Sequence, residues 1–291
     1  MLTIENDRLK VRVKELGAEL CGIYSKEHDT EYMWQPGYEI WDHSCLTLFP
    51  NNGRIYKDRT VIGGRVYPAT MQGFAKTQVF TVTENTGERA VLELRANDET
   101  RRYFPYEFTL RVSFSLAGDK LTVSFNVDNH GEEPMYFCLG MHPGFYLPLA
   151  LGEKTEDYVI RFNRRQNISR LVNEPTTMLL TGERKPYLTD GTDIPLRDDL
   201  FNGGSHLLEG VDAESVTLRS TKSGRFVEMG ISGFPYMCLW GNAIRPYLVC
   251  IEPWCGTSDF IDTDHIWEKR PGALCAPAHG SEERSISFRV G

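Results

Sequence analysis

Two ionisable residues in this sequence stand at the ends of apolar runs, and each is followed directly by proline. His142 closes Phe137-Cys138-Leu139-Gly140-Met141, and Glu252 closes Leu248-Val249-Cys250-Ile251. Because proline lacks an N–H and fixes its backbone, we expect both side chains at strand ends with a defined direction. A carboxylate in such a run is costly to bury, so its pKa should rise, and histidine already titrates near neutrality. These are the residue types that general acid–base catalysis requires.

Both residues also have a structural interpretation, which the residue types leave open. Glu252 could pair with a nearby arginine, and His142 could be a hydrogen-bonded histidine of the core. Other histidines, namely His43, His206, His265 and His279, lie in polar or irregular stretches and are expected at the surface.

Several common chemistries have no motif in this sequence. It contains no Gly-x-Gly-x-x-Gly, no Gly-x-x-x-x-Gly-Lys, no His-Glu-x-x-His and no Gly-x-Ser-x-Gly. We therefore predict no nucleotide cofactor. Carbohydrate chemistry fits what remains, because it needs only carboxylates, imidazoles, polar hydrogen-bonding groups and aromatic faces.

Charge and cysteine content exclude further classes. The 291 residues include 32 Lys plus Arg and 40 Asp plus Glu, a net charge of −8, which disfavours nucleic acid and anionic membranes as partners. The seven cysteines are odd in number and lack Cys-x-x-Cys spacing, so neither a disulfide framework nor a metal site is expected. The first fourteen residues lack the apolar core of a signal peptide, and we predict a cytoplasmic protein.

The dominant hydrophobic period is two, which is typical of strands with one buried face. Residues 108–116 and 121–127 alternate in this way, and Ala117-Gly118-Asp119 between them has the composition of a hairpin turn. The uncharged stretch 135–152 contains prolines and glycines, so we expect buried strands around a turn there rather than a membrane span. Residues 198–208 could hold one or two short helical turns. Further strand-like runs are 9–13, 79–84, 91–95, 158–162, 216–219, 226–231 and 286–290. We predict an all-β fold, a large antiparallel β-sandwich forming a single domain over 1–291.

With these segments in place, the sequence resembles the aldose 1-epimerase (mutarotase) family, in particular its shorter bacterial branch. The segments around His142 and Glu252 carry most of the resemblance because of their order and separation. The other matching segments are Gly17–Leu20, Tyr32–Trp34, Trp41, Leu48–Pro50, Gly53-Arg54, Gln72–Ala75 and Asp199–Phe201.

The resemblance implies a large antiparallel β-supersandwich with an open sugar cleft, and a reaction that interconverts the α and β anomers of an aldose without a cofactor. It implies that Glu252 is the base that takes the anomeric proton and that His142 is the acid that protonates the ring oxygen. It further implies that Arg54 and Asp199 bind sugar hydroxyls. Trp254 and Trp240 could stack on a sugar face, although strand aromatics are more often core residues.

One position departs from the family pattern. The family usually has a second histidine where this sequence has Gln72, and a glutamine amide donates a hydrogen bond but supplies no proton. Gln72 is therefore expected to bind substrate rather than to transfer protons. Two alternatives to a mutarotase follow: a non-catalytic carbohydrate-binding or sensing protein, and another sugar isomerase, epimerase or lyase on the same fold. The sequence does not indicate the oligomeric state or the particular sugar.

Overall fold

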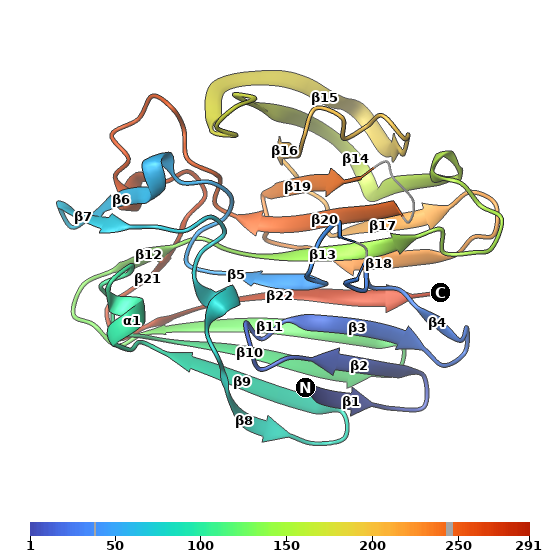
Figure 1. Ribbon diagram of the computed structural model, residues 1–291, viewed down its shortest axis with the longest axis horizontal. Coiled ribbons are helices and arrows are strands. Elements are labelled where there is room, and N and C mark those ends of the chain that lie inside the picture. The colour runs from blue at the N-terminus through green and yellow to red at the C-terminus, as the bar shows by residue number, and fades with distance from the viewer. Residues whose placement is uncertain (38, 243–246) are drawn as a thin grey trace.

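Antiparallel strands make up nearly all of the regular structure in the computed structural model, which describes residues 1–37, 39–242 and 247–291 (Figure 1). The largest sheet has fourteen strands, and β15 (Leu180–Pro195) joins it by pairing with β14. The other thirteen follow one another in the order β5 (Cys45–Leu48), β13 (Leu139–Leu147), β20 (Tyr247–Cys255), β19 (Tyr236–Gly241), β16 (His206–Glu209), β14 (Tyr158–Asn173), β17 (Ser215–Ser220), β18 (Phe226–Gly230), β22 (Ser281–Val290), β11 (Lys120–Asn129), β10 (Phe108–Ala117), β9 (Arg89–Arg95) and β8 (Thr81–Asn85).

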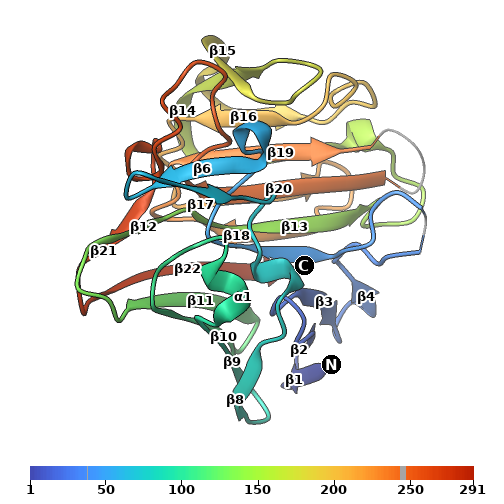
Figure 2. The same cartoon turned by 60° about the vertical axis from the view of Figure 1, so that its left-hand side comes forward.

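A four-stranded sheet lies beside the β9–β11 end of the large sheet (Figures 1 and 2). It comprises β1 (Leu2–Glu5), β2 (Leu9–Val13), β3 (Leu20–Ser25) and β4 (Thr30–Glu31). Two two-stranded sheets lie at one end of the molecule: the hairpin of β6 (Arg59–Ile62) with β7 (Arg65–Pro68), and β12 (Met135–Phe137) paired with the distant β21 (Leu274–Ala276). Helical structure is confined to α1 (Asp98–Arg101) and the 3₁₀ turns η1 (Tyr56–Asp58), η2 (Ala75–Thr77), η3 (Thr155–Asp157) and η4 (Trp267–Lys269) within the described residues.

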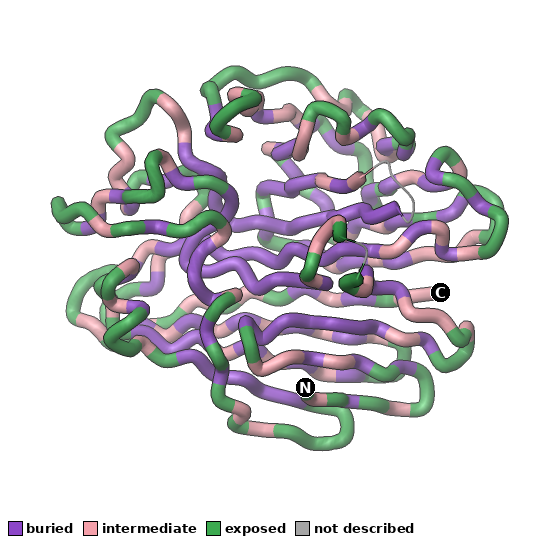
Figure 3. The backbone as a smooth tube through the Cα atoms, viewed as in Figure 1, coloured by how far each residue is buried: buried purple, intermediate pink, exposed green. Residues whose placement is uncertain are grey.

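The period-two pattern produces the core as predicted. On β10 and β11 the apolar residues are buried and the polar residues between them are partly exposed. The two strands pair in register from Phe108 opposite Asn129 to Ala117 opposite Lys120, so the turn has two residues, and Gly118 there has φ 60°. Buried residues run along the central strands, while exposed ones collect in the connections (Figure 3). The predicted all-β antiparallel fold is confirmed.

The two prolines beside the ionisable residues do not end their strands, so that prediction is wrong. Pro143 lies inside β13 and Pro253 inside β20. The two strands pair at Gly140–Trp254 and again at Gly144–Cys250, with no paired residues between these points. A proline is tolerated where the ladder between neighbouring strands is interrupted, because no N–H is needed there. His142 and Glu252 therefore face each other in mid-strand, across this gap.

Two other predictions concern the connections. Residues 135–152 form β12 and β13 with a short connection, as expected for buried strands. Residues 198–203 are turns rather than helix, and His206 begins strand β16. Within the ranges 1–37, 39–242 and 247–291, no helix is long and apolar enough to cross a membrane.

Candidate functional site

The two ionisable residues singled out by the sequence meet on neighbouring strands near the β5 edge of the large sheet. His142 Nε2 lies 3.3 Å from Glu252 Oε1, and the residues are only 5% and 1% exposed. His142 comes from β13 and Glu252 from β20, which are neighbouring strands. An isolated charge would be very costly at this depth, so the two groups must either be neutral or form an ion pair with each other.

Burial controls the proton equilibria of this pair. It lowers the pKa of His142 to about 3, and the charges of His43 and Lys76 act in the same direction. Burial also raises the pKa of Glu252 well above its usual value, against smaller opposing effects from the Cys238 thiol and the Trp254 indole. The form favoured at neutral pH is thus a carboxylic acid beside a neutral imidazole. Moving one proton across the 3.3 Å contact converts this form into a carboxylate and an imidazolium, with no exchange with solvent.

Aromatic rings, rather than a hydrogen bond to Nδ1, keep the imidazole of His142 in its orientation. Its Nδ1 has no hydrogen-bond partner among the described residues. The Trp41 indole stacks on the ring with centroids 4.6 Å apart and planes at 29°, and Trp240 meets the ring edge-on at 6.0 Å. Trp34 donates a hydrogen bond from its indole to the Trp41 carbonyl at 2.9 Å, which anchors this loop residue. The two indoles next to His142 fix its orientation and exclude water from one side.

A cavity of about 290 Å³ opens in front of the pair. It brings together most of the site residues predicted from the sequence, namely His142, Glu252, Arg54, Gln72 and Trp254, and Trp240 also lines it. Three polar atoms on its walls are buried and lack a hydrogen-bond partner in the described part of the chain: Glu252 Oε2, Trp254 Nε1 and Asn173 Oδ1. Buried polar atoms are normally satisfied, so the walls present hydrogen-bonding capacity that a polar ligand would use.

Asp199 is the predicted site residue that the structure does not bring to this cavity. Its side chain is 68% exposed and accepts a hydrogen bond from Arg197 Nε at 2.9 Å, in the turn before β16. The implied role of Asp199 as a sugar ligand therefore has no support from the geometry and stays a prediction.

Other lining residues were not identified from the sequence. Ser205, Cys238 and Ser258 line the cavity, together with Trp41, Met71 and Met178. Cys238 is the direct cross-strand partner of Glu252, so knowledge of strand pairing would have found it. Trp41 was recognised only within the family resemblance, since its contact with His142 joins residues far apart in the chain.

Asn52 fixes the loop that carries Arg54 to the two strands of the acid–base pair. Its buried amide nitrogen lies within hydrogen-bond distance of three carbonyl oxygens, of Cys255 at 2.9 Å and of Leu139 and Gly256 at 3.3 Å. The Gln72 N–H donates to the Gly53 carbonyl at 2.8 Å, so the two loops are also bonded to each other. Gly73, with φ 74°, is needed here because a Cβ would lie 2.1 Å from the Phe49 carbonyl oxygen.

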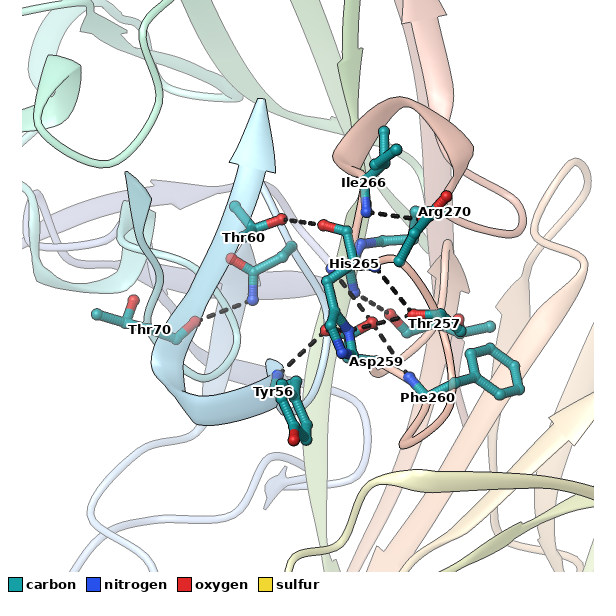
Figure 4. Close-up of polar contacts among 12 residues, drawn as sticks. Tyr56, Thr60, Thr70, Thr257, Asp259, Phe260, His265, Ile266 and Arg270 are labelled. Carbon is teal, nitrogen blue, oxygen red and sulfur yellow. Dashed lines mark hydrogen bonds and ion pairs between the residues drawn. The ribbon is translucent and has the colours of Figure 1, made fainter. Parts of the chain in front are cut away.

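The Asp259 carboxylate joins this loop to the segment after β20 (Figure 4). It accepts the Tyr56 N–H at 3.1 Å, and His265 Nδ1 lies 3.1 Å from it. The buried Arg270 guanidinium is 3.8 Å away on the other side. The backbone N–H of Asp259 also donates to the Arg54 carbonyl at 2.8 Å. Since Arg54 lies between these contacts and Asn52, its backbone is held at the mouth of the cavity.

Within the described ranges, no group of three or more His, Cys, Asp and Glu side chains is arranged to hold a metal ion. All seven cysteines belong to this described part and are free thiols, six of them buried.

Comparison with known proteins agrees with this fold and site. A structure of a galactose mutarotase-related enzyme from Lactobacillus acidophilus superposes with a TM-score of 0.92 at 31% identity, covering 99% of this chain and 96% of the other. A galactose mutarotase-like protein from Lactobacillus casei also gives 0.92, at 27% identity with both chains fully covered. The fold is therefore that of the galactose mutarotase-like β-supersandwiches.

Sequence comparison identifies the family. The Aldose 1-epimerase family model matches residues 1–265. The chromosomal LacX protein of Lactococcus lactis is 32% identical over 280 residues, covering 93% of this chain and 92% of that protein. The chain belongs to the aldose 1-epimerase family.

Replacing Glu252 by glutamine should stabilise the protein at neutral pH. The unfolded chain releases the Glu252 proton above about pH 4.5, whereas the folded protein retains it. The contribution of Glu252 to the free energy of unfolding is therefore fully present below pH 4.5, and it is lost as the pH rises toward the raised pKa. Glutamine does not ionise. The advantage of Glu252→Gln in free energy of unfolding should grow by up to about 1.4 kcal/mol per pH unit from mildly acid to neutral pH. Urea unfolding over a pH series measures it.

Glu153→Gln is the matched control, because Glu153 is also buried but accepts hydrogen bonds from Ser220 and Tyr158. Burial alone would raise the pKa of Glu153, but these hydrogen bonds and those from Ser223 outweigh burial and lower the pKa. The Glu153 carboxylate therefore stabilises the folded protein at neutral pH. Glu153→Gln should destabilise the protein there. A Glu252→Gln variant that is likewise destabilised at neutral pH would show that the buried pair is ionised instead.

Asp259→Asn should loosen the loop that carries Arg54. An asparagine cannot satisfy both Tyr56 and the buried Arg270, and loss of a charged partner in such a place costs about 1–3 kcal/mol. Hydrogen exchange of the Tyr56 amide should therefore quicken by about tenfold or more. Asp264→Asn is the control, since its carboxylate is about half exposed and bonds to Lys269 on the same segment. Equal exchange in both variants would contradict this role for Asp259.

Proposed function

We propose that this protein is a mutarotase, which interconverts the α and β anomers of an aldose by opening and closing the sugar ring. The observation that carries the proposal is the buried contact between His142 and Glu252, in a cavity of a chain that belongs to the aldose 1-epimerase family. The seven free thiols fit a reducing cytoplasm, which we include in the proposal.

In the proposed reaction the sugar exchanges one proton with each member of this pair. The Glu252 carboxylate takes the proton of the anomeric hydroxyl as the C1–O1 electron pair forms a carbonyl. The bond between C1 and the ring oxygen breaks, and the ring oxygen takes a proton from the His142 imidazolium. The open-chain aldehyde then lies beside a carboxylic acid and a neutral imidazole. Rotation about the C1–C2 bond and closure on the other face return both protons and regenerate the ion pair.

The low polarity of the site favours this sequence. The ion pair that starts the reaction becomes a neutral pair as the ring opens, and burial lowers the free energy of the neutral pair relative to the ion pair. The site therefore stabilises the protonation state that accompanies the open-chain sugar.

A sugar also suits the walls of the cavity. The unpartnered Glu252 Oε2, Trp254 Nε1 and Asn173 Oδ1 include both oxygen atoms and an N–H donor, and a sugar hydroxyl can pair with either kind because it both donates and accepts. Arg54 and the Gln72 amide lie on the loops at the rim and supply further donors. We assign Arg54, Gln72 and Trp254 to sugar binding.

Anomer exchange measured by NMR saturation transfer tests the proposal on a panel of aldoses. On a sugar that the wild-type protein accelerates, His142→Gln and Glu252→Gln should each slow exchange by about 10²–10⁴-fold, the usual contribution of a proton-transfer group. Glu153→Gln, checked for folding by circular dichroism, should retain the wild-type rate because Glu153 lies outside the cavity. A Glu252→Gln protein with undiminished exchange would rule out its role as base.

A sugar-binding protein without catalysis is the second candidate, and Gln72 favours it. The Gln72 amide lines the cavity but supplies no proton. If the protein is an attenuated enzyme, Gln72→His should raise the exchange rate, because an imidazole can share in protonating the ring oxygen. Calorimetry gives sugar affinity for both forms. Sugar binding without exchange in either form would support the binding protein instead.

A further inference from the structure

A second cavity, of about 430 Å³, lies on the opposite face of β16 from the site described above. Side chains alternate between faces along a strand, so Leu207 lines the first cavity and His206 lines the second. The second cavity is enclosed by β14, β15 and the segment before β16. Its polar lining includes Arg170, Tyr187, Arg197 and His206, and Leu188, Ile194 and Leu200 are apolar.

The lining contains one arginine, Arg170, that pairs with no carboxylate in the part of the chain that the structure describes. Arg170 is half-buried, and burial lowers the pKa of its guanidinium. The guanidinium donates to the Ser205 carbonyl at 3.3 Å, and within the described residues it makes no ion pair with a carboxylate. A half-buried guanidinium without a counter-charge is costly, and it attracts an anion.

Two aspartates near this cavity, Asp193 and Asp199, already have arginine partners. Asp193, on the wall, accepts two hydrogen bonds from Arg161, at 2.7 and 2.6 Å. Asp199 accepts one from Arg197 Nε at 2.9 Å. Each of these aspartates is paired with an arginine other than Arg170, so neither serves as the partner of Arg170. In a protein with a net charge of −8, this local positive charge is unexpected.

His206 adds a neutral hydrogen-bond donor. It is 5% exposed, so its predicted surface position is wrong, because it begins a strand and packs against Phe201 and Tyr187. Burial first, and then the charges of Arg170 and Arg197, lower the pKa of His206 to about 4. His206 Nδ1 lies 2.9 Å from the Tyr187 hydroxyl. When that hydroxyl donates to Nδ1, the hydrogen of the neutral ring is on Nε2 and is available to an acceptor.

We propose that this cavity binds a small organic anion, a phosphate monoester or a carboxylate with an apolar body. Arg170 supplies the balancing charge and charge-assisted hydrogen bonds, to which carboxylates and phosphates are suited. Arg197 and the His206 ring supply further donors, and the apolar wall accommodates the rest of the ligand. This binding site is separate from the proposed sugar site and does not depend on turnover.

Titration of the full-length protein with phenyl phosphate, benzoate and the neutral benzyl alcohol tests the proposal. We follow binding by calorimetry and by the NMR signals of the His206 imidazole. At least one of the two anions should bind and shift these signals, with affinity that falls as salt is added, while the alcohol should not bind. Whichever anion binds identifies the acidic group. Binding of neither anion, or equal binding of the alcohol, would overturn the proposal.

Variants locate the site. Arg170→Gln should weaken anion binding by about tenfold or more, since it removes the unbalanced charge. Arg164→Gln is the matched control: this exposed arginine pairs with Asp212 and lies outside the cavity, so affinity should be unchanged. Should Arg170→Gln fail to fold, Arg197→Gln, at an exposed position, and Tyr187→Phe, which removes only a hydroxyl, replace it and should also weaken binding. Unchanged affinity in the folded variants would contradict the assignment.

Discussion

The burial of two ionisable groups side by side is the constraint on which the rest of this structure depends. Neither His142 nor Glu252 is stable as an isolated charge at its depth, yet their contact at 3.3 Å has no net charge in either tautomer. Keeping that contact requires the register of β13 and β20, which is fixed on both sides of the gap at the prolines. The indoles of Trp41 and Trp240 then keep the imidazole oriented where no hydrogen bond does so.

Two kinds of interaction hold the site residues in position. The strands hold the acid–base pair through backbone ladders and a buried core. The loops that carry Arg54 and Gln72 depend instead on a few side-chain bonds, made by Asn52 and Asp259. Buried polar side chains of this kind act over long sequence separations, because each satisfies backbone groups that would otherwise be unpaired.

The sequence predicted what depends on local pattern. Alternation in 108–127 determined the β10–β11 hairpin, because burial of one face sets both the strands and their register. The family resemblance, rather than spacing, brought His142 and Glu252 together. The prolines were misread as strand ends because only the partner strand shows where the ladder is interrupted. Trp41 contacts His142 and Asp259 contacts Tyr56, each about a hundred or more positions away in the chain, and no local pattern reveals such contacts. The burial of His206 likewise depends on strand β16, which local composition did not predict.

Because His142 and Glu252 lie on strands whereas Arg54 and Gln72 lie on loops, substitutions in the two sets have different structural consequences. A substitution at the rim, at Gln72 for example, alters neither the strand register nor the buried contact behind it. Rim residues can therefore vary while the fold and the pair persist. On this scaffold a change of rim side chain therefore leaves in place the paired strands that hold His142 against Glu252.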